Sequence, residues 1–259
     1  MARQVLALEA RLRHCRNVRS IGVRPNFSDY SLQEAGWIRE AETIYYPTGF
    51  YADLFDAIGK RTFPSYHTYK CVQDKIKQSA LFQLAGLPHP VTRVFYGKRQ
   101  LGKIKAYFSY PCIAKEPRGS AMGRGVFLIR SDADLEGYTR GRHVAYIQEL
   151  LPIDRDIRVV VIGGRVVHAY WRIASQGEFR TNVALGGRIC LDSVPDAAVD
   201  LARLAARTCG WDDVGLDICC RDGHYVILEA NMKYGREGFR AAGIDYFQMM
   251  ERMIDDGEI

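Results

Sequence analysis

The sequence lacks most of the short motifs that identify a catalytic or metal site by themselves. Its six histidines form neither an HxH nor an HExxH cluster, so a zinc site has little support. Its seven cysteines are an odd number and include no CxxC pair, which favours reduced thiols and a cytoplasmic location over a disulfide framework. A Walker loop ending in GK[ST] and a GxGxxG dinucleotide-binding fingerprint are both missing.

Long apolar segments are missing as well. No apolar run approaches the roughly 18 residues of a membrane-spanning helix, and residues 1–19 carry too many charges for a signal peptide. The hydrophobic fraction of 47% and the charged fraction of 25% are ordinary for a soluble globular protein. A chain of 259 residues can form one large domain or two or three smaller lobes. We therefore expect a soluble, cytoplasmic protein without a membrane partner.

The net charge of +6 is unevenly distributed. Residues 93–142 contain eleven Lys or Arg against four Asp or Glu. Such a basic block fits an anionic small ligand, a nucleic acid or an anionic membrane. Basic and aromatic residues show little of the interleaving that single-strand binding requires, and no nucleic-acid motif is recognisable. An anionic small ligand is therefore favoured, with a nucleic-acid or ribosome-associated binder as an alternative.

Residues 1–66 alternate helical and strand-like patterns. SLQEAGWIRE at 31–40 predicts an amphipathic helix, TIYYP at 43–47 a short strand, and FYADLFDAIG at 50–59 a second helix. This is a βα-like pattern, but it offers only one or two strands, too few for a full dinucleotide-binding sheet. We therefore predict a short N-terminal α/β segment.

Two features follow in the middle of the chain. Residues 65–90 have the periodicity of a single helix, which Gly86 and Pro88 end. Residues 110–129 then predict two strands joined by the glycine-rich loop PRGSAMGRG at 117–125, with Lys115 just before it. Small residues let backbone N–H groups approach phosphate oxygens, and a lysine can neutralise their charge. A plain flexible hairpin loop is the alternative.

The segment VGLDICCRDGHYVILEAN at 214–231 predicts a β-hairpin around a turn at residues 221–223. Glu229 and Asn231 share a face, and Asp217 lies opposite Glu229 if the loop has three residues, such as 222–224. Two carboxylates and an amide oxygen on one face suit a hard cation such as Mg²⁺. In the alternative, one carboxylate pairs with an arginine and another faces water.

The order of these motifs resembles the ATP-grasp superfamily and, within it, the RimK-type glutamate-ligase branch, over residues 64–254. The resemblance is carried by QDK at 73–75, CIAKEPRGSAMGRGV at 112–126, IQELLP at 147–152, DRDIRVVVIGGRVVHAYWRIA at 154–174, GEFRTNVALGG at 177–187, VGLDICCRDGHYVILEAN at 214–231 and GREGFRAAGID at 235–245. It implies an α/β fold with two lobes that clamp ATP, behind a shortened N-terminal α/β segment. The implied units are residues 1–66, a small lobe at 67–145 with a lid loop, and a C-terminal lobe at 146–259 with the metal-binding hairpin.

The resemblance also implies roles for individual residues. These are Lys75 and Lys115 on the ATP phosphates, Gly119, Gly123 and Gly125 in the lid, Glu149 and Leu150 at the adenine hinge, Asp156 on the ribose, Arg180 and Asn182 near the phosphates, Arg172 at an acyl phosphate, and Asp217, Glu229 and Asn231 as Mg²⁺ or Mn²⁺ ligands. Arg158 is expected to support its strand. Each role has a structural alternative: a solvated lysine, Asp156 paired with Arg155 or Arg158, or Arg172 in a surface ion pair.

The implied reaction is ATP-dependent carboxylate–amine ligation. A substrate carboxylate attacks the γ-phosphorus of ATP to give an acyl phosphate and ADP, and an amine then attacks the acyl carbon. Glutamate or a similar amino acid, added to a peptide or a metabolite, is the expected pair of substrates. The alternatives are a ligase of another ATP-grasp branch and a nucleotide-binding protein without turnover. The identity of the substrates and the presence of a homo-oligomer are left open.

Overall fold

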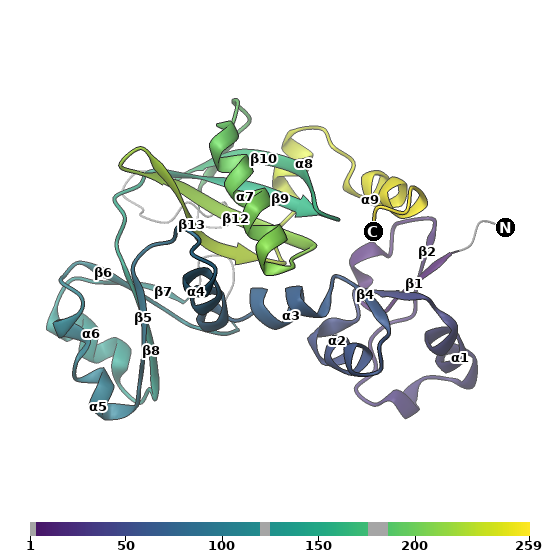
Figure 1. Cartoon of the computed structure of the whole chain (residues 1–259), viewed down its shortest axis with the longest axis horizontal. Coiled ribbons are helices and arrows are strands. Elements are labelled where there is room, and N and C mark those ends of the chain that lie inside the picture. The colour runs from purple at the N-terminus through teal and green to yellow at the C-terminus, as the bar shows by residue number, and fades with distance from the viewer. Residues whose placement is uncertain (1–3, 120–124, 176–185) are drawn as a thin grey trace.

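The computed structural model describes residues 4–119, 125–175 and 186–259, which form three sheets (Figure 1). The five-stranded sheet lies in the middle, with the N-terminal module at one end and the small lobe at the other (Figure 1). The predicted mixed α/β class is confirmed. No helix in the described ranges is long and apolar enough to span a bilayer.

The N-terminal module is a parallel sheet in the order β2-β1-β3-β4. Its elements are β1 (Val5–Ala7), η1 (Ala10–Leu12), β2 (Val18–Ser20), η2 (Phe27–Asp29), α1 (Leu32–Glu40), β3 (Thr43–Tyr45), α2 (Thr48–Ala57) and β4 (Arg61–Phe63). The two helices agree with the predicted ones, but the prediction of one or two strands is wrong. Each of the four strands has only three residues, which is too short for an alternating pattern to be recognised.

The single helix predicted from residue 65 is also wrong, because the chain breaks there into α3 (Tyr66–Val72) and α4 (Lys75–Leu84). At the break, Asp74 has extended backbone angles, and its carboxylate accepts hydrogen bonds from the backbone N–H groups of Ile76 and Lys77. An aspartate in this position is a favourable helix N-cap. The break makes Lys75 the first residue of α4.

The small lobe is an antiparallel sheet in the order β5-β8-β6-β7. Its elements are β5 (Thr92–Tyr96), α5 (Gly97–Leu101), η3 (Ile104–Ala106), β6 (Cys112–Lys115), β7 (Val126–Ile129), α6 (Asp132–Thr139) and β8 (Val144–Glu149). One apolar cluster joins this sheet to α6 and η3 through Phe95, Ile104 and Leu135. Because β8 continues through the predicted lobe boundary at 145/146, we propose that this boundary falls after Glu149.

The large lobe is a five-stranded sheet in the order β11-β10-β9-β12-β13. Its elements are β9 (Arg155–Ile162), β10 (Arg165–Ile173), β11 (Arg188–Cys190), α7 (Asp196–Cys209), β12 (Asp213–Arg221), β13 (His224–Asn231), α8 (Glu237–Ala241) and α9 (Tyr246–Asp255). In the central strand β9, Val159 and Val161 pack in the cluster that contains α7, while Val160 and Ile162 pack in the cluster that contains α9. Burial on both faces explains the continuous apolar run of β9 and gives the hairpin a rigid support.

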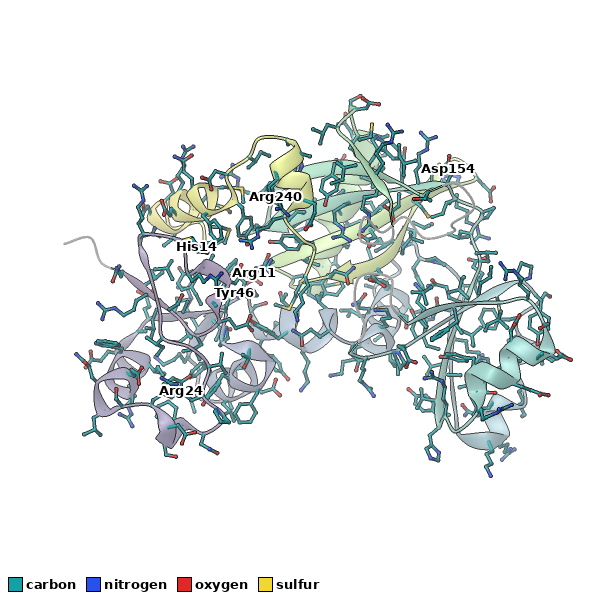
Figure 2. All side chains as sticks on the ribbon, turned by 180° about the vertical axis from the view of Figure 1, so that it is seen from behind. Arg11, His14, Arg24, Tyr46, Asp154 and Arg240 are labelled. Carbon is teal, nitrogen blue, oxygen red and sulfur yellow. The ribbon has the colours of Figure 1, made fainter. Side chains whose placement is uncertain are left out.

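Arg11 connects the N-terminal module to the large lobe. Its guanidinium lies 5.1 Å from the centre of the Tyr46 ring, which Figure 2 shows beside it, and 4.8 Å from the Tyr234 ring. Arg11 Nη1 donates a hydrogen bond of 2.9 Å to the carbonyl of Met232, and Nη2 lies 3.6 Å from Asp213 Oδ2. Met232 follows β13 directly, so the N-terminal module holds the end of the hairpin in place.

Candidate nucleotide and metal site

The register of the β12–β13 hairpin places Asp217 directly opposite Glu229. The loop has two residues, Asp222 and Gly223, both with positive φ (+49° and +81°), as expected for a tight hairpin turn. The predicted three-residue loop is therefore wrong, and an uninterrupted ladder from this turn would pair Asp217 with Leu228. A β-bulge at Leu228 shifts the register by one residue. The bulge restores the predicted pairing of the two carboxylates on one face.

Asn231 lies beside this pair, with its Nδ2 atom 3.5 Å from Asp217 Oδ2. Gln78, on α4, holds the segment between Glu229 and Asn231, because its side-chain amide both donates to and accepts from the backbone of Ala230, each at 2.9 Å. The structure thus brings the three predicted metal ligands together. Sequence reasoning missed Gln78, whose only signal was a polar residue on the buried face of a helix.

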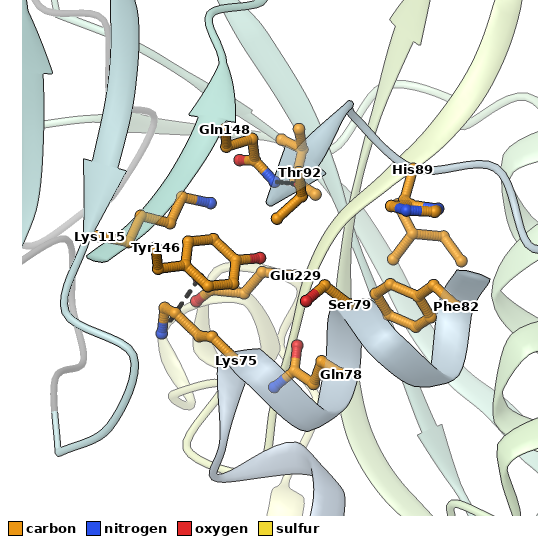
Figure 3. A pocket seen from close by; sticks show the side chains of 12 residues that line it. Lys75, Gln78, Ser79, Phe82, His89, Thr92, Lys115, Tyr146, Gln148 and Glu229 are labelled. Atoms are coloured by element: carbon orange, nitrogen blue, oxygen red, sulfur yellow. Dashed lines mark hydrogen bonds and ion pairs between the residues drawn. The ribbon is translucent and has the colours of Figure 1, made fainter. Parts of the chain in front are cut away.

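Two lysines face Glu229 from other elements. Lys75 Nζ lies 3.4 Å from Glu229 Oε2, and Lys115, the last residue of β6, is buried close by (Figure 3). Burial raises the pKa of Glu229, but the attraction of Lys75 and Lys115 outweighs it and lowers the pKa to about 2. Burial lowers the pKa of Lys115, and Glu229 opposes that shift. Two lysines against one carboxylate leave an excess positive charge that a polyphosphate can neutralise.

These groups line one end of a pocket between the small lobe and the hairpin. Figure 3 shows Lys75, Lys115 and Glu229 at this end and Phe82 at the other. The lining residues are Lys75, Gln78, Ser79, Phe82, His89, Thr92, Lys115, Tyr146, Gln148, Ile227, Leu228 and Glu229. The charged end and the apolar end follow the order of a polyphosphate and a planar base, although the empty space of about 260 Å³ is smaller than a typical ligand pocket of roughly 300–1,000 Å³.

Tyr146 and Gln148, on β8, also line this pocket and were missed by sequence reasoning. Gln148 Nε2 donates a hydrogen bond of 2.9 Å to Thr92 Oγ1. Burial raises the pKa of Tyr146 to about 12, so its hydroxyl stays protonated at neutral pH. In the sequence, Tyr146 and Gln148 are polar side chains at alternate positions of a strand, and this spacing places both on one face.

The glycine-rich loop begins beside the N-terminus of α4. Asp74, which caps α4, accepts a hydrogen bond of 2.7 Å from Arg118 Nε, and the N–H of Lys75 donates to the carbonyl of Pro117 at 3.0 Å. Gly119 and Gly125 have positive φ (+71° and +76°), a conformation that glycine adopts without steric cost. The base of the predicted lid and the helix that carries Lys75 are therefore one connected unit. Gly123, which was predicted to belong to the lid, lies outside the described residues.

Two buried arginines hold Asp217. Arg158 binds it with Nε at Oδ1 and with Nη2 at Oδ2, the latter at 3.0 Å. Arg172 Nη2 lies 2.9 Å from Asp217 Oδ2 and also binds Asp156 with two contacts of 2.7 and 2.5 Å. Burial lowers the pKa of Arg172, but Asp156 and Asp217 raise it well above its usual value. Asp156, predicted at the ribose, thus pairs with Arg172 rather than with Arg155 or Arg158.

The donor atoms on the hairpin fit a divalent cation. Two carboxylates and one amide oxygen suit Mg²⁺ or Mn²⁺, which bind a few protein oxygens together with substrate phosphates. Asp217 already accepts two contacts from Arg158, one from Arg172 and one from Asn231, so binding of a cation by this carboxylate requires that one of these donors moves away. Within the described ranges, no three or more His, Cys, Asp or Glu residues form a group that could hold a metal ion.

Four further residues were predicted to contact ATP: Glu149, Leu150, Arg180 and Asn182. The Glu149 carboxylate accepts from the Val91 N–H at 2.6 Å and from Arg221 Nη1 at 2.5 Å. Its side chain is therefore engaged, and we propose that Glu149 and Leu150 contact adenine through their backbone. Arg180 and Asn182 lie outside the described residues.

Comparison with known proteins identifies the family of the chain. The model of the RimK-like ATP-grasp domain matches residues 72–254. A probable alpha-L-glutamate ligase of Parasynechococcus marenigrum is 32% identical over 209 residues, which are 78% of this chain and 45% of that protein. The ribosomal protein bS6–L-glutamate ligase of Escherichia fergusonii is 30% identical over 193 residues, or 71% of this chain and 63% of that protein. This chain thus spans less than two thirds of the length of either relative.

The fold agrees as well. The crystal structure of a RimK domain ATP-grasp protein from Sphaerobacter thermophilus has a TM-score of 0.72, covering 96% of this chain and 98% of that one at 18% identity. At this identity the likeness shows the fold alone, and the family assignment rests on the match to residues 72–254. The chain belongs to the RimK-like ATP-grasp family.

Proposed function

We propose that the chain is an ATP- and divalent-metal-dependent ligase that joins a carboxylate to an amine with release of ADP and phosphate. Its substrates would be glutamate or a similar amino acid and a peptide or metabolite acceptor. The observation that carries this proposal is the position of Glu229, which faces Lys75 and Lys115 while sharing a hairpin face with Asp217. The names of the two glutamate-ligase relatives support the choice of amino acid.

The residues around the hairpin suit distinct tasks in such a reaction. When bound, ATP supplies the phosphoryl group that activates the carboxylate, and the divalent ion neutralises phosphate charge. Lys75 and Lys115 would bind the phosphates, because both stand at the charged end of the pocket. Glu229, with a pKa of about 2, is an ionised oxygen donor at any physiological pH.

Asp217 also needs a fixed side-chain orientation if it is to bind the metal ion. Its carboxylate is the cross-strand neighbour of Arg158 on β9, and Arg172 reaches it from β10. Arg158 Nη1 also donates to the Tyr234 carbonyl at 2.8 Å, so the guanidinium itself has little freedom. Arg158 is therefore a positioning residue for the metal ligand, a more specific role than the strand support expected from the sequence.

The test is a screen for ADP release with single amino acids against candidate acceptors, with the product mass recorded. We expect ADP only when ATP, a divalent ion and both substrates are present. The product should be heavier than the acceptor by the mass of the amino acid minus water. Binding of ATP without ADP release in any combination would instead support a nucleotide-binding protein without turnover.

A pair of variants on one hairpin links this activity to the site. Glu229→Gln is expected to abolish metal-dependent ADP formation, because the amide is a weaker ligand and leaves two lysines uncompensated. Asp222→Asn, at a side chain 92% exposed in the turn, removes the same charge away from the pocket and is expected to be neutral. Equal ADP formation in the two variants would contradict the assignment of Glu229.

A further inference from the structure

β5 forms one edge of the small-lobe sheet, and part of its outer side has no strand partner within the described ranges. The Val91 carbonyl accepts from the N–H of Glu149, and the N–H of Gly97 donates to the His143 carbonyl, so these positions face β8. Backbone groups alternate in direction along an antiparallel strand. The backbone groups of residues 92, 94 and 96 therefore point away from β8.

Two of these outward groups are satisfied by side chains. Gln83 Nε2 donates to the Thr92 carbonyl at 3.3 Å, and the N–H of Tyr96 donates to Gln100 Oε1 at 2.7 Å. Between them, the N–H and the carbonyl of Val94 face outward without a hydrogen-bond partner among the described residues. A free donor and acceptor on a sheet edge is the feature to which an extended peptide adds as a further strand.

The outer side of β5 opens onto a groove of about 410 Å³ between β5 and α4. Residues that line it include Ile76, Ala80, Gln83, Val91, Val94 and Tyr107. Val91 is 57% exposed and Tyr107 is 51% exposed, so apolar surface borders the free backbone groups. Ser79 and Thr92 line both this groove and the nucleotide pocket, which places the groove directly behind that pocket.

The charge of the groove indicates the kind of chain that fits. The Arg93 guanidinium lies 3.8 Å from the centre of the Tyr107 ring, and no acidic side chain is among the described lining residues. Lys98 and Arg99 follow on α5, within the basic block at 93–142. A carboxylate on an incoming peptide would therefore meet positive charge. A nucleic acid could meet the same charge, but its backbone has no alternating N–H and C=O groups to pair with Val94.

We propose that an extended acidic peptide docks in this groove by adding a strand to the β5 edge. Its main chain pairs with the N–H and carbonyl of Val94, its apolar side chains contact Val91 and Tyr107, and a carboxylate meets Arg93. Such a peptide would serve as the acceptor of the ligase; this purpose rests on the proposed function, whereas the binding itself is measurable without catalysis.

The test is fluorescence anisotropy with a fluorescein-labelled peptide of alternating glutamate and valine. Wild-type protein is expected to bind it with an affinity that falls as salt rises, because exposed charges are screened. Val94→Pro removes the outward N–H but leaves the β8 ladder intact, and edge strands tolerate proline at such positions. We expect binding about tenfold weaker in Val94→Pro, as for one lost backbone hydrogen bond, and nearly unchanged in Val94→Ala.

Matched charge variants test the acidic preference. Arg93→Gln is expected to weaken binding about fivefold, whereas Lys103→Gln, outside the groove lining, removes the same charge with little effect. ATP affinity serves as the folding control in every variant, because the nucleotide contacts lie on the other side of β5. If Val94→Pro does not fold, Arg93→Gln and Tyr107→Ala carry the test.

Three results would overturn the docking site: no peptide binding by the wild-type protein, equal binding by Val94→Pro and Val94→Ala, or tighter binding of a single-stranded RNA than of the peptide. A protein that binds the peptide but never releases ADP would contradict the proposed ligase function and leave the docking site supported.

Discussion

Arg172 Nη2 lies 2.9 Å from Asp217 Oδ2 in the interior of the large lobe, and both side chains are less than a tenth exposed. The same guanidinium binds Asp156, so one arginine joins a predicted ribose ligand to a predicted metal ligand. The sequence suggested an acyl-phosphate contact for Arg172, with a surface ion pair as the alternative. The observed ion pair is buried, and a role in chemistry must therefore be separated from a role in stability.

A double variant makes that separation. Arg172→Met is expected to destabilise the fold by about 3–5 kcal/mol, because it removes a buried cation that two buried carboxylates share. Adding Asp156→Asn removes the excess negative charge and is expected to restore most of the stability. If Arg172 also meets the reacting phosphoryl group, single-turnover ADP formation at saturating ATP stays low in the double variant but not in Asp156→Asn alone. If turnover in the double variant recovers together with the urea midpoint of unfolding, Arg172 acts only through stability.

Lys115 is expected to bind the nucleotide directly. Lys115→Met should weaken ATP binding by about 1.5–3 kcal/mol, or roughly 10- to 150-fold, as for a lost charge-assisted contact in a desolvated site. Lys103→Met, at an exposed lysine of the same lobe, is the control and should bind ATP as the wild type does. Isothermal titration of ATP measures both, and equal affinities would remove Lys115 from the site.

The Asp74 cap is expected to act on nucleotide binding as well as on stability. Asp74→Ala removes the N-cap of α4 and the Arg118 contact, and Ser131→Ala removes the N-cap of α6. Each lost cap should lower stability by about 0.5–2 kcal/mol. Only Asp74→Ala should also weaken ATP binding, because α4 begins with Lys75 and adjoins the glycine-rich loop. Thermal unfolding and ATP titration of both variants check this, and a parallel loss of ATP affinity in Ser131→Ala would refute the link.

The lowered pKa of Glu229 predicts a pH-dependent contribution to stability. Its folded pKa of about 2 lies below the ordinary value near 4.5, so its ionised form stabilises the fold above pH 4.5, and that stabilisation disappears as the pH falls toward 2. Lys75→Met removes one of the two cations and should raise the folded pKa. The stability difference between the wild type and Lys75→Met is therefore largest at neutral pH and shrinks below about pH 4.5. Urea midpoints at several pH values measure it, and a difference independent of pH would contradict the pairing.

Local patterns in the sequence were sufficient for much of the site. The hairpin, its polar interruptions at Asp217, Glu229 and Asn231, and the lysine before the glycine-rich loop were all predicted. Turn chemistry and strand alternation depend on neighbours within a few residues, so they can be recognised without the fold. The same reasoning failed where local signals were short or ambiguous, as in the three-residue strands of the N-terminal module and the break at Asp74.

Only the tertiary structure decided which charges pair. The sequence offered Arg155 and Arg158 as partners for Asp156, yet Arg172 pairs with it, because β10 lies beside β9 and places Arg172 across from Asp156. Asp217 meets Arg158 because β12 lies on the other side of β9. The polar residues and their faces thus follow from the sequence by itself, whereas their partners follow from the order of strands in a sheet. That order is set by long-range packing of apolar faces, which no local spacing of residues encodes.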